Sequence, residues 1–180
     1  MALVVDKSGS MEDHYEIAMD TARTITYGLN LKYQDTRLAY MTYSDTANLH
    51  FDFERYRTKE ETIEAIYLDR VSGDTNIDDA LNQLRTLFQA DGKRSNVRQI
   101  AILISDGKLE SGVSTTLNNA FKLRQDASDL EIFAIGIGSN INRMNLNDIA
   151  SQPSSRYRYD IALASDVGEK VNQVLDTICF

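Results

Sequence analysis

Two long apolar runs constrain the fold of this 180-residue chain more than any other feature of its sequence. They are RQIAILIS at residues 98–105 and EIFAIGIG at residues 131–138. A strand with one exposed face alternates polar and apolar residues, so runs this continuous predict strands that are covered on both faces. The segment TTLNNAFKLRQDA, residues 115–127, lies between them and is expected to be helical. This strand–helix–strand order is typical of a parallel sheet in an α/β fold.

The same alternation of strands and helices continues along the rest of the chain. Further strands are expected at residues 2–5, 36–44, 46–53 and 155–161. Further helices, with apolar residues at helical spacing, are expected at 14–31, 58–69, 76–90, 144–152 and 166–178. The turn at Ser44-Asp45 is short enough for a hairpin, so one edge strand should run antiparallel. The sequence therefore predicts a doubly wound, Rossmann-like α/β fold in a single domain of residues 1–180. Its sheet should be mainly parallel and six-stranded, with one antiparallel edge strand and helices on both faces.

Composition argues against several classes of partner. The net charge of −8 and the sequence pI of about 4.7 disfavour the phosphates of nucleic acid and anionic membrane surfaces. No apolar run approaches the roughly 20 residues of a membrane-spanning helix, so no membrane insertion is expected. The one cysteine, Cys179, is either an unpaired thiol or half of a pair whose partner lies outside this sequence.

Five oxygen-bearing side chains lie where the predicted fold would gather them at one edge of the sheet. Asp6, Ser8 and Ser10 follow the first strand in the stretch DKSGS. Asp106 follows the central strand, and Thr75 precedes a helix in SGDTNIDD. In doubly wound sheets the ligand lies beyond the carboxyl ends of the strands. Two carboxylates and three hydroxyls are hard ligands, which suit Mg²⁺, Mn²⁺ or Ca²⁺ and disfavour a structural zinc site.

Each of these residues also has a simpler explanation. Ser10 could merely cap a helix, and Thr75 or Asn76 could cap the next one. Asp106 and Gly107 could form only a turn. Taken singly, these explanations are the commoner ones. The whole set, in this order and at these strand ends, favours a metal site.

On these motifs the chain resembles the von Willebrand factor type A domain, also called the I domain. Asp6-Lys7-Ser8-Gly9-Ser10 matches the Asp-x-Ser-x-Ser loop of that family. Thr75 in GDTN matches the family's threonine, and Asp106 in ISDGK matches its later aspartate. FAIGIG resembles the fifth strand of the family, and DVGEKVNQVLDTIC resembles its last helix. One departure is Gly73-Asp74, where many members have two glycines, and the aspartate adds negative charge near the site.

The resemblance implies a metal-ion-dependent adhesion site formed by Asp6, Ser8, Ser10, Thr75 and Asp106. It implies a protein-binding module and not an enzyme. An acidic side chain of the partner would complete the coordination of Mg²⁺, with Mn²⁺ or Ca²⁺ as other candidates. The implied partner is a matrix or cell-surface protein, a collagen-like one among the candidates. The implied setting is extracellular, either secreted or on a cell-surface ectodomain, and Cys179 resembles half of the cysteine pair that brackets many matrix members. The alternatives are a cytoplasmic scaffold subunit and a metal-dependent phosphoester hydrolase.

Overall fold

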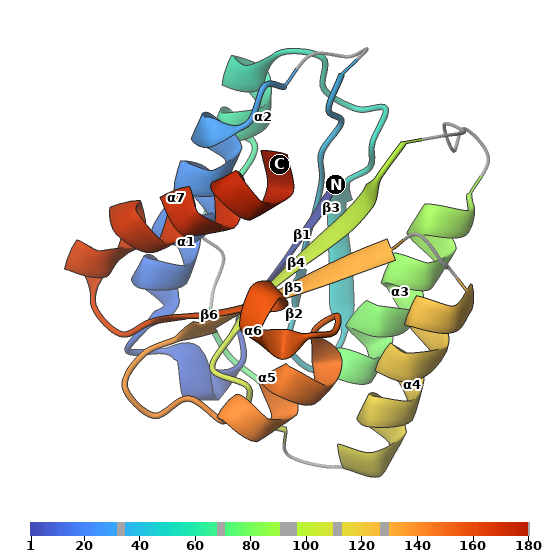
Figure 1. Cartoon of the computed structure of the whole chain (residues 1–180), viewed down its shortest axis with the longest axis vertical. Coiled ribbons are helices and arrows are strands. Elements are labelled where there is room, and N and C mark those ends of the chain that lie inside the picture. Colours follow the sequence, from blue (N-terminus) through green and yellow to red (C-terminus); the bar gives the residue numbers. More distant parts are fainter. Residues whose placement is uncertain (32–34, 68–70, 91–96, 110–112, 127–129, 180) are drawn as a thin grey trace.

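The computed structural model describes residues 1–31, 35–67, 71–90, 97–109, 113–126 and 130–179. Within these residues, six strands form one sheet in the order β3-β2-β1-β4-β5-β6 (Figure 1). The strands are β1 (Ala2–Asp6), β2 (Ala39–Tyr43), β3 (Ala47–Phe51), β4 (Gln99–Ser105), β5 (Leu130–Ile137) and β6 (Arg158–Ile161). All neighbouring pairs are parallel except β2 with β3, so one edge strand is antiparallel. The predicted sheet is therefore confirmed.

Helices cover both faces of this sheet, as Figure 1 shows. One face carries α1 (Tyr15–Gly28) and α7 (Val167–Cys179), with α2 (Lys59–Glu64) beside α1. The other face carries α3 (Ile77–Gln89), α4 (Val113–Asp126) and α5 (Arg143–Ile149). None of the helices in the described part of the chain combines the length and apolar character that crossing a membrane requires.

The central strands are buried on both faces, as their composition predicts. Every residue of β1 and β4 is buried. Along β4, Ile100, Ile102 and Ile104 belong to the core beneath α1 and α7, whereas Ala101 and Leu103 belong to the core beneath α3 and α4. Side chains of a strand alternate between faces, so a strand between two helical layers is apolar at every position. This accounts for the continuous apolar run at β4.

The last predicted strand is shorter than expected. The sequence predicts a strand over 155–161, but α6 (Ser154–Tyr157) occupies the first half of that segment and β6 only the second. The Tyr157 hydroxyl donates to Glu131 (3.0 Å), and the Tyr157 ring packs edge-on against a phenylalanine of β5. These tertiary contacts hold Tyr157 in a helical turn, although tyrosine by itself favours strands.

The other predicted helices lie where expected, with differences at their ends. The helix predicted at 58–69 corresponds to α2, which already ends at Glu64, and residues 68–69 lie outside the described residues. The helix predicted at 115–127 corresponds to α4, and residue 127 likewise lies outside the described part. Short turns Gly9–Met11 and Ala164–Asp166 precede α1 and α7.

Candidate metal centre

Asp6 and Asp106 leave the sheet side by side, at the place where the strand order reverses. β1 and β4 are parallel neighbours, and Val5 of β1 pairs with Ile104 of β4. The chain runs outward from β1 to β2 and β3, then returns to β4 on the other side of β1. Doubly wound sheets hold their ligands beyond the carboxyl ends of the strands at such a reversal. The fold therefore gathers the two aspartates at the position expected for a ligand.

A backbone hydrogen bond fastens the loop that carries Thr75 to the loop after β1. The Gly9 amide donates to the Gly73 carbonyl over 2.9 Å. Gly73 has a φ of 88°, a left-handed conformation that glycine adopts readily. A Cβ at this position would lie 2.4 Å from the carboxylate of Asp45. The Thr75 loop is thus held against the Asp-x-Ser-x-Ser loop, and Asp45 lies beside Gly73.

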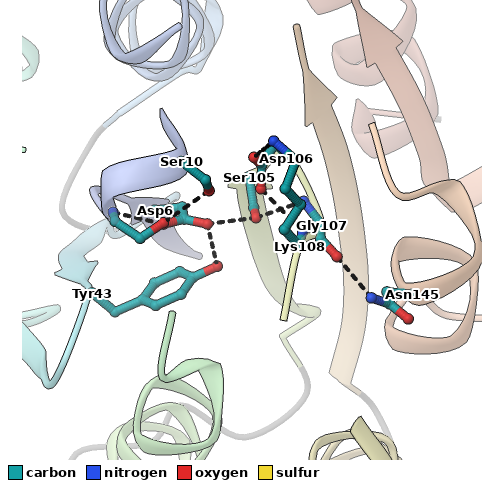
Figure 2. A network of polar contacts seen from close by, with 9 residues as sticks. Asp6, Ser10, Tyr43, Ser105, Asp106, Gly107, Lys108 and Asn145 are labelled. Atoms are coloured by element: carbon teal, nitrogen blue, oxygen red, sulfur yellow. Dashed lines mark hydrogen bonds and ion pairs between the residues drawn. The ribbon is translucent and has the colours of Figure 1, made fainter. Parts of the chain in front are cut away.

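Asp6 is fully buried, and both of its carboxylate oxygens accept hydrogen bonds (Figure 2). Oδ1 accepts from the Ser8 amide (2.9 Å), and Oδ2 accepts from the hydroxyls of Ser105 (2.7 Å) and Tyr43 (3.1 Å). Burial raises the pKa of Asp6, and the hydrogen bonds from Ser105 and Ser8 offset only part of that increase. An ionised Asp6 therefore lacks sufficient compensating charge, which a bound cation would supply.

Asp106 is almost as deeply buried, at 1% exposure, but it has different partners. Its Oδ1 accepts from the Lys108 amide (3.0 Å), and its Oδ2 lies 2.8 Å from the Lys108 ammonium. Oδ2 nevertheless accepts no well-aligned hydrogen bond from the described residues, so Lys108 contributes charge without hydrogen-bond geometry. Gly107, between Asp106 and Lys108, turns the chain with a φ of 76°. Its carbonyl accepts a hydrogen bond from the Asn145 side chain (2.8 Å).

The three hydroxyl groups of the predicted site differ in their partners. The hydroxyl oxygens of Ser8 and Ser10 lie 3.3 Å apart. Thr75 is buried, and its hydroxyl has no hydrogen-bond partner among the described residues. Leaving a buried hydroxyl unpaired costs roughly 1–3 kcal/mol of folding free energy, so this group is suited to binding a ligand.

The capping explanations for Ser10 and Thr75 do not hold in this structure. α3 is capped by Asn76, whose side chain accepts from the Asp79 amide (3.3 Å), so Thr75 is not its cap. Ser10 lies within the turn Gly9–Met11 and caps no helix through its side chain. Asp106 and Gly107 do form a turn, but a residue in a turn can also bind a metal, so this explanation does not compete with the metal site.

Sequence reasoning missed three residues that support the site: Tyr43, Ser105 and Asn145. Ser105 directly precedes Asp106 in the sequence, so its position beside a predicted ligand could have identified it. Tyr43 is paired with Asp6 across β1 and β2, a register that the sequence does not reveal. Burial, followed by the charge of Asp6, raises the pKa of Tyr43 well above its ordinary value, so its hydroxyl remains a donor.

The donor set fits a hard divalent cation. The described residues contain no group of three or more His, Cys, Asp or Glu side chains suited to a metal ion. Coordination at this edge of the sheet would therefore rest on the two carboxylates together with hydroxyl oxygens and water, a set that Mg²⁺ accepts. The unpaired Thr75 hydroxyl and the undercompensated Asp6 charge both agree with such an ion.

Curated relatives match this chain over most of its length but only over part of their own. It is 27% identical to the collagen alpha-1(XII) chain of Notophthalmus viridescens, over 99% of this chain and 19% of that protein. It is 27% identical to integrin alpha-X of Homo sapiens, over 99% of this chain and 16% of the integrin. Matrilin-1 of Gallus gallus is 26% identical over 85% of this chain and 31% of its own length. The chain thus spans less than a third of each of these relatives.

Solved structures share the fold. Proximal thread matrix protein 1 from the mussel byssus matches with a TM-score of 0.85 at 24% identity, over 99% of this chain and 47% of that one. The manganese-loaded TRAP protein of Plasmodium vivax matches with a TM-score of 0.81 at 20% identity, over 98% of this chain and 72% of that one. The family model of the von Willebrand factor type A domain matches residues 1–173, and the chain therefore belongs to that family.

Proposed function

We propose that residues 1–180 act as one metal-dependent protein-binding domain. Asp6, Ser8, Ser10, Thr75 and Asp106 would hold a divalent cation, with Mg²⁺ as the first candidate and Mn²⁺ or Ca²⁺ as others. The observation that carries this proposal is the buried Thr75 hydroxyl, which has no hydrogen-bond partner in the described residues. The loop that leads to Thr75 is hydrogen-bonded, through Gly73, to Gly9 of the Asp-x-Ser-x-Ser loop.

The charge balance of the site explains why an acidic partner would bind. Asp6 and Asp106 are the only carboxylates of the predicted site, and the hydroxyls add no charge, so a divalent cation that does not contact both carboxylates directly would keep residual positive charge. When bound, such a cation acts as a Lewis acid that accepts a further oxygen ligand. A carboxylate from a partner protein is a strong candidate for that ligand, because it supplies both an oxygen and a negative charge.

The setting proposed for this domain is the extracellular matrix or the cell surface. Its relatives include collagens, an integrin and a matrilin, and a further structure of the mussel byssus protein is described as having a zinc-occupied metal site of this type. We propose a matrix or cell-surface protein as the partner, with a collagen-like protein among the candidates. We propose a binding role and not a catalytic one, because the relatives are collagens, an integrin and a matrilin.

Two measurements test this function. The first is calorimetric titration of Mg²⁺, Mn²⁺ and Ca²⁺ into the wild type and into Asp106→Asn, which removes one carboxylate charge at constant size. Asp176→Asn, at an exposed position on α7, is the matched control. Saturable binding by the wild type and the control, but not by Asp106→Asn, is expected. Equal binding by all three proteins would contradict the site.

The second measurement is binding to immobilised fibrillar collagen, fibronectin and laminin, in millimolar Mg²⁺ and again in EDTA. The proposal predicts that at least one surface retains the wild type in Mg²⁺ only, and does not retain Asp106→Asn in either buffer. Binding that is equal with and without EDTA would show that the domain uses another surface.

A further inference from the structure

We propose that Lys108 is a built-in competitor of the divalent cation, and that it sets the affinity of the site by occupying Asp106 when the metal is absent. This inference rests on the proposed function and assigns a specific role to one residue beside that site. The Lys108 ammonium lies 2.8 Å from Asp106 Oδ2, and Figure 2 shows the lysine side chain folded back over the aspartate.

The competition is for one particular oxygen. Asp106 Oδ1 already accepts the amide of Lys108 at 3.0 Å, so Oδ2 is the oxygen that is free to bind a cation. A metal ion that binds Oδ2 would have to displace the ammonium, because two cations at van der Waals distance repel each other strongly in a site of low dielectric. The two cations are therefore alternatives.

The lysine is suited to being displaced. Its side chain is 41% exposed while that of Asp106 is 1% exposed, so the ammonium can move into water without crossing the protein. The ammonium makes an ion pair with Oδ2, but within the described residues Oδ2 accepts no aligned hydrogen bond, so the contact is weaker than a well-formed charged hydrogen bond. A compact ammonium on a flexible four-carbon stem is also easily reoriented.

Lys108 also has a structural effect in the metal-free protein. A carboxylate buried as deeply as Asp106 destabilises the fold when nothing compensates its charge. Lys108 provides that compensation, and so it favours the metal-free state. Any interaction that stabilises the metal-free state alone lowers the affinity for metal by the corresponding factor.

Among the described residues, no cationic side chain competes in the same way for Asp6. Its carboxylate accepts from the Ser8 amide and from the hydroxyls of Ser105 and Tyr43, which are neutral donors. Neutral hydroxyls can remain in place beside a metal-bound carboxylate, whereas an ammonium on the same oxygen cannot. We therefore expect the competition to act through Asp106.

The test compares Lys108→Met, which keeps the apolar stem and removes the charge, with Lys170→Met as the matched control. Lys170 has a similar exposure of 34% and also pairs with a neighbouring carboxylate, Glu169 at 3.8 Å. By calorimetry, Lys108→Met should bind Mg²⁺ about tenfold more tightly than the wild type, a change of about 1.4 kcal/mol. The control should lie within about twofold. In thermal unfolding, Lys108→Met should be less stable than the wild type without Mg²⁺ and equally stable with saturating Mg²⁺.

Lys108→Arg separates direct competition from a general charge effect. It keeps the charge, but its guanidinium can align two N–H groups with a carboxylate, so it should compete better than lysine. Mg²⁺ affinity should then fall about threefold or more below that of the wild type. This variant also decides the question if Lys108→Met does not fold.

The possible outcomes separate this inference from the proposed function. Unchanged Mg²⁺ affinity in either folded Lys108 variant, with saturable binding in the wild type, would overturn the competitor role and leave the proposed function standing. Absence of saturable binding in the wild type would instead overturn the metal site itself.

Discussion

Each end of the sheet contains a network of polar side chains, deeply buried around Asp6 and Asp106 and partly exposed around Arg98 and Glu131. The two networks also differ in how far their charges are compensated. At the amino ends of β4 and β5, Arg98 donates to both oxygens of Glu131 (2.8 and 3.0 Å). Tyr157 also donates to Glu131 (3.0 Å), and Arg98 donates to the carbonyl of Ile178 near the end of α7. Burial by itself would raise the pKa of Glu131, but the hydrogen bonds from Arg98 and Tyr157, together with the nearby arginine charges, outweigh it and lower the pKa. Each charge in this network has its partner within the protein.

At the carboxyl ends of β1 and β4 the balance is reversed. Burial keeps the pKa of Asp6 raised despite the hydrogen bonds that it accepts. The hydroxyl of Thr75 and Oδ2 of Asp106 have no hydrogen-bond partner among the described residues, although Lys108 lies beside Oδ2. The difference suggests a criterion for assigning roles. A polar network that satisfies its own charges stabilises the fold, whereas one that leaves charge and hydroxyls unsatisfied is suited to an external ligand.

The largest effect should come from Asp6→Asn, which would separate metal binding from stability. The raised pKa means that the neutral form of Asp6 is favoured on folding. The stability contributed by Asp6 is therefore present below its unfolded pKa of about 3.9 and is lost as the pH rises through the higher folded pKa. At pH 7 the amide should leave the melting temperature of the metal-free protein unchanged, or raise it by up to about 3 °C. Mg²⁺ affinity should fall roughly 100-fold or more.

The control for Asp6→Asn is the same acid-to-amide change at the opposite end, Glu131→Gln. For Glu131→Gln the outcome should be the opposite of that for Asp6→Asn: the free energy of unfolding should fall, and Mg²⁺ affinity should be unchanged. A fall of more than about 5 °C in the metal-free melting temperature of Asp6→Asn would show that Asp6 is mainly a structural acceptor for Ser105 and Tyr43.

Much of the fold could be predicted because its signals are local in the sequence. The apolar runs of β4 and β5 are continuous because helices cover both faces, and burial of this kind leaves a direct trace in composition. The turn at 44–45 is also a local signal, and it correctly indicated the antiparallel hairpin of β2 and β3. The segment 155–161 was predicted less well, because Tyr157 is fixed by contacts with β5 that no local pattern reveals.

The candidate site could be predicted only as far as residue types and their order allow. Asp6 and Asp106 follow recognisable strands, so their convergence follows from the rule for doubly wound sheets. The partners of Asp6 could not be deduced, since Tyr43 reaches it through the pairing register of β1 and β2. The contrast between the unpaired Thr75 hydroxyl and the capping Asn76 also depends on side-chain orientation at a helix start.

A smaller effect is expected for Thr75→Val, which replaces the hydroxyl with a methyl group of similar size. The buried hydroxyl has no partner in the part of the chain that the structure describes, so its removal should leave the free energy of unfolding unchanged or raise it by up to about 1 kcal/mol. Mg²⁺ affinity should fall about tenfold, because one oxygen ligand is lost. Urea unfolding and calorimetry measure the two quantities on the same protein.

Thr75→Ser is the matched variant for this comparison, because it keeps the hydroxyl and removes the methyl group. It should retain Mg²⁺ affinity within about threefold and lose a little stability. If Thr75→Val were destabilised by more than about 1 kcal/mol with Mg²⁺ affinity unchanged, the Thr75 hydroxyl would have a structural role only.

The smallest effect on metal binding should come from Glu131→Gln, which tests the network in which each charge has its partner within the protein. The lowered pKa means that ionised Glu131 stabilises the folded state, and this contribution is present above the unfolded pKa of about 4.3 and lost as the pH falls through the lower folded pKa. The variant should lose up to about 1 kcal/mol of unfolding free energy at pH 7, because an amide weakens the paired contact with Arg98, and solvent screens that contact since the Arg98 side chain is 45% exposed. The difference from the wild type should stay constant down to about pH 5 and narrow below about pH 4.3. Urea unfolding across this pH range measures the difference in unfolding free energy, while Mg²⁺ affinity should stay within about twofold of the wild type.

A stability difference that does not change with pH would mean that lost packing, and not lost charge, causes the destabilisation. A large loss of Mg²⁺ affinity would show that the two ends of the sheet are coupled, and the criterion drawn from their comparison would then fail.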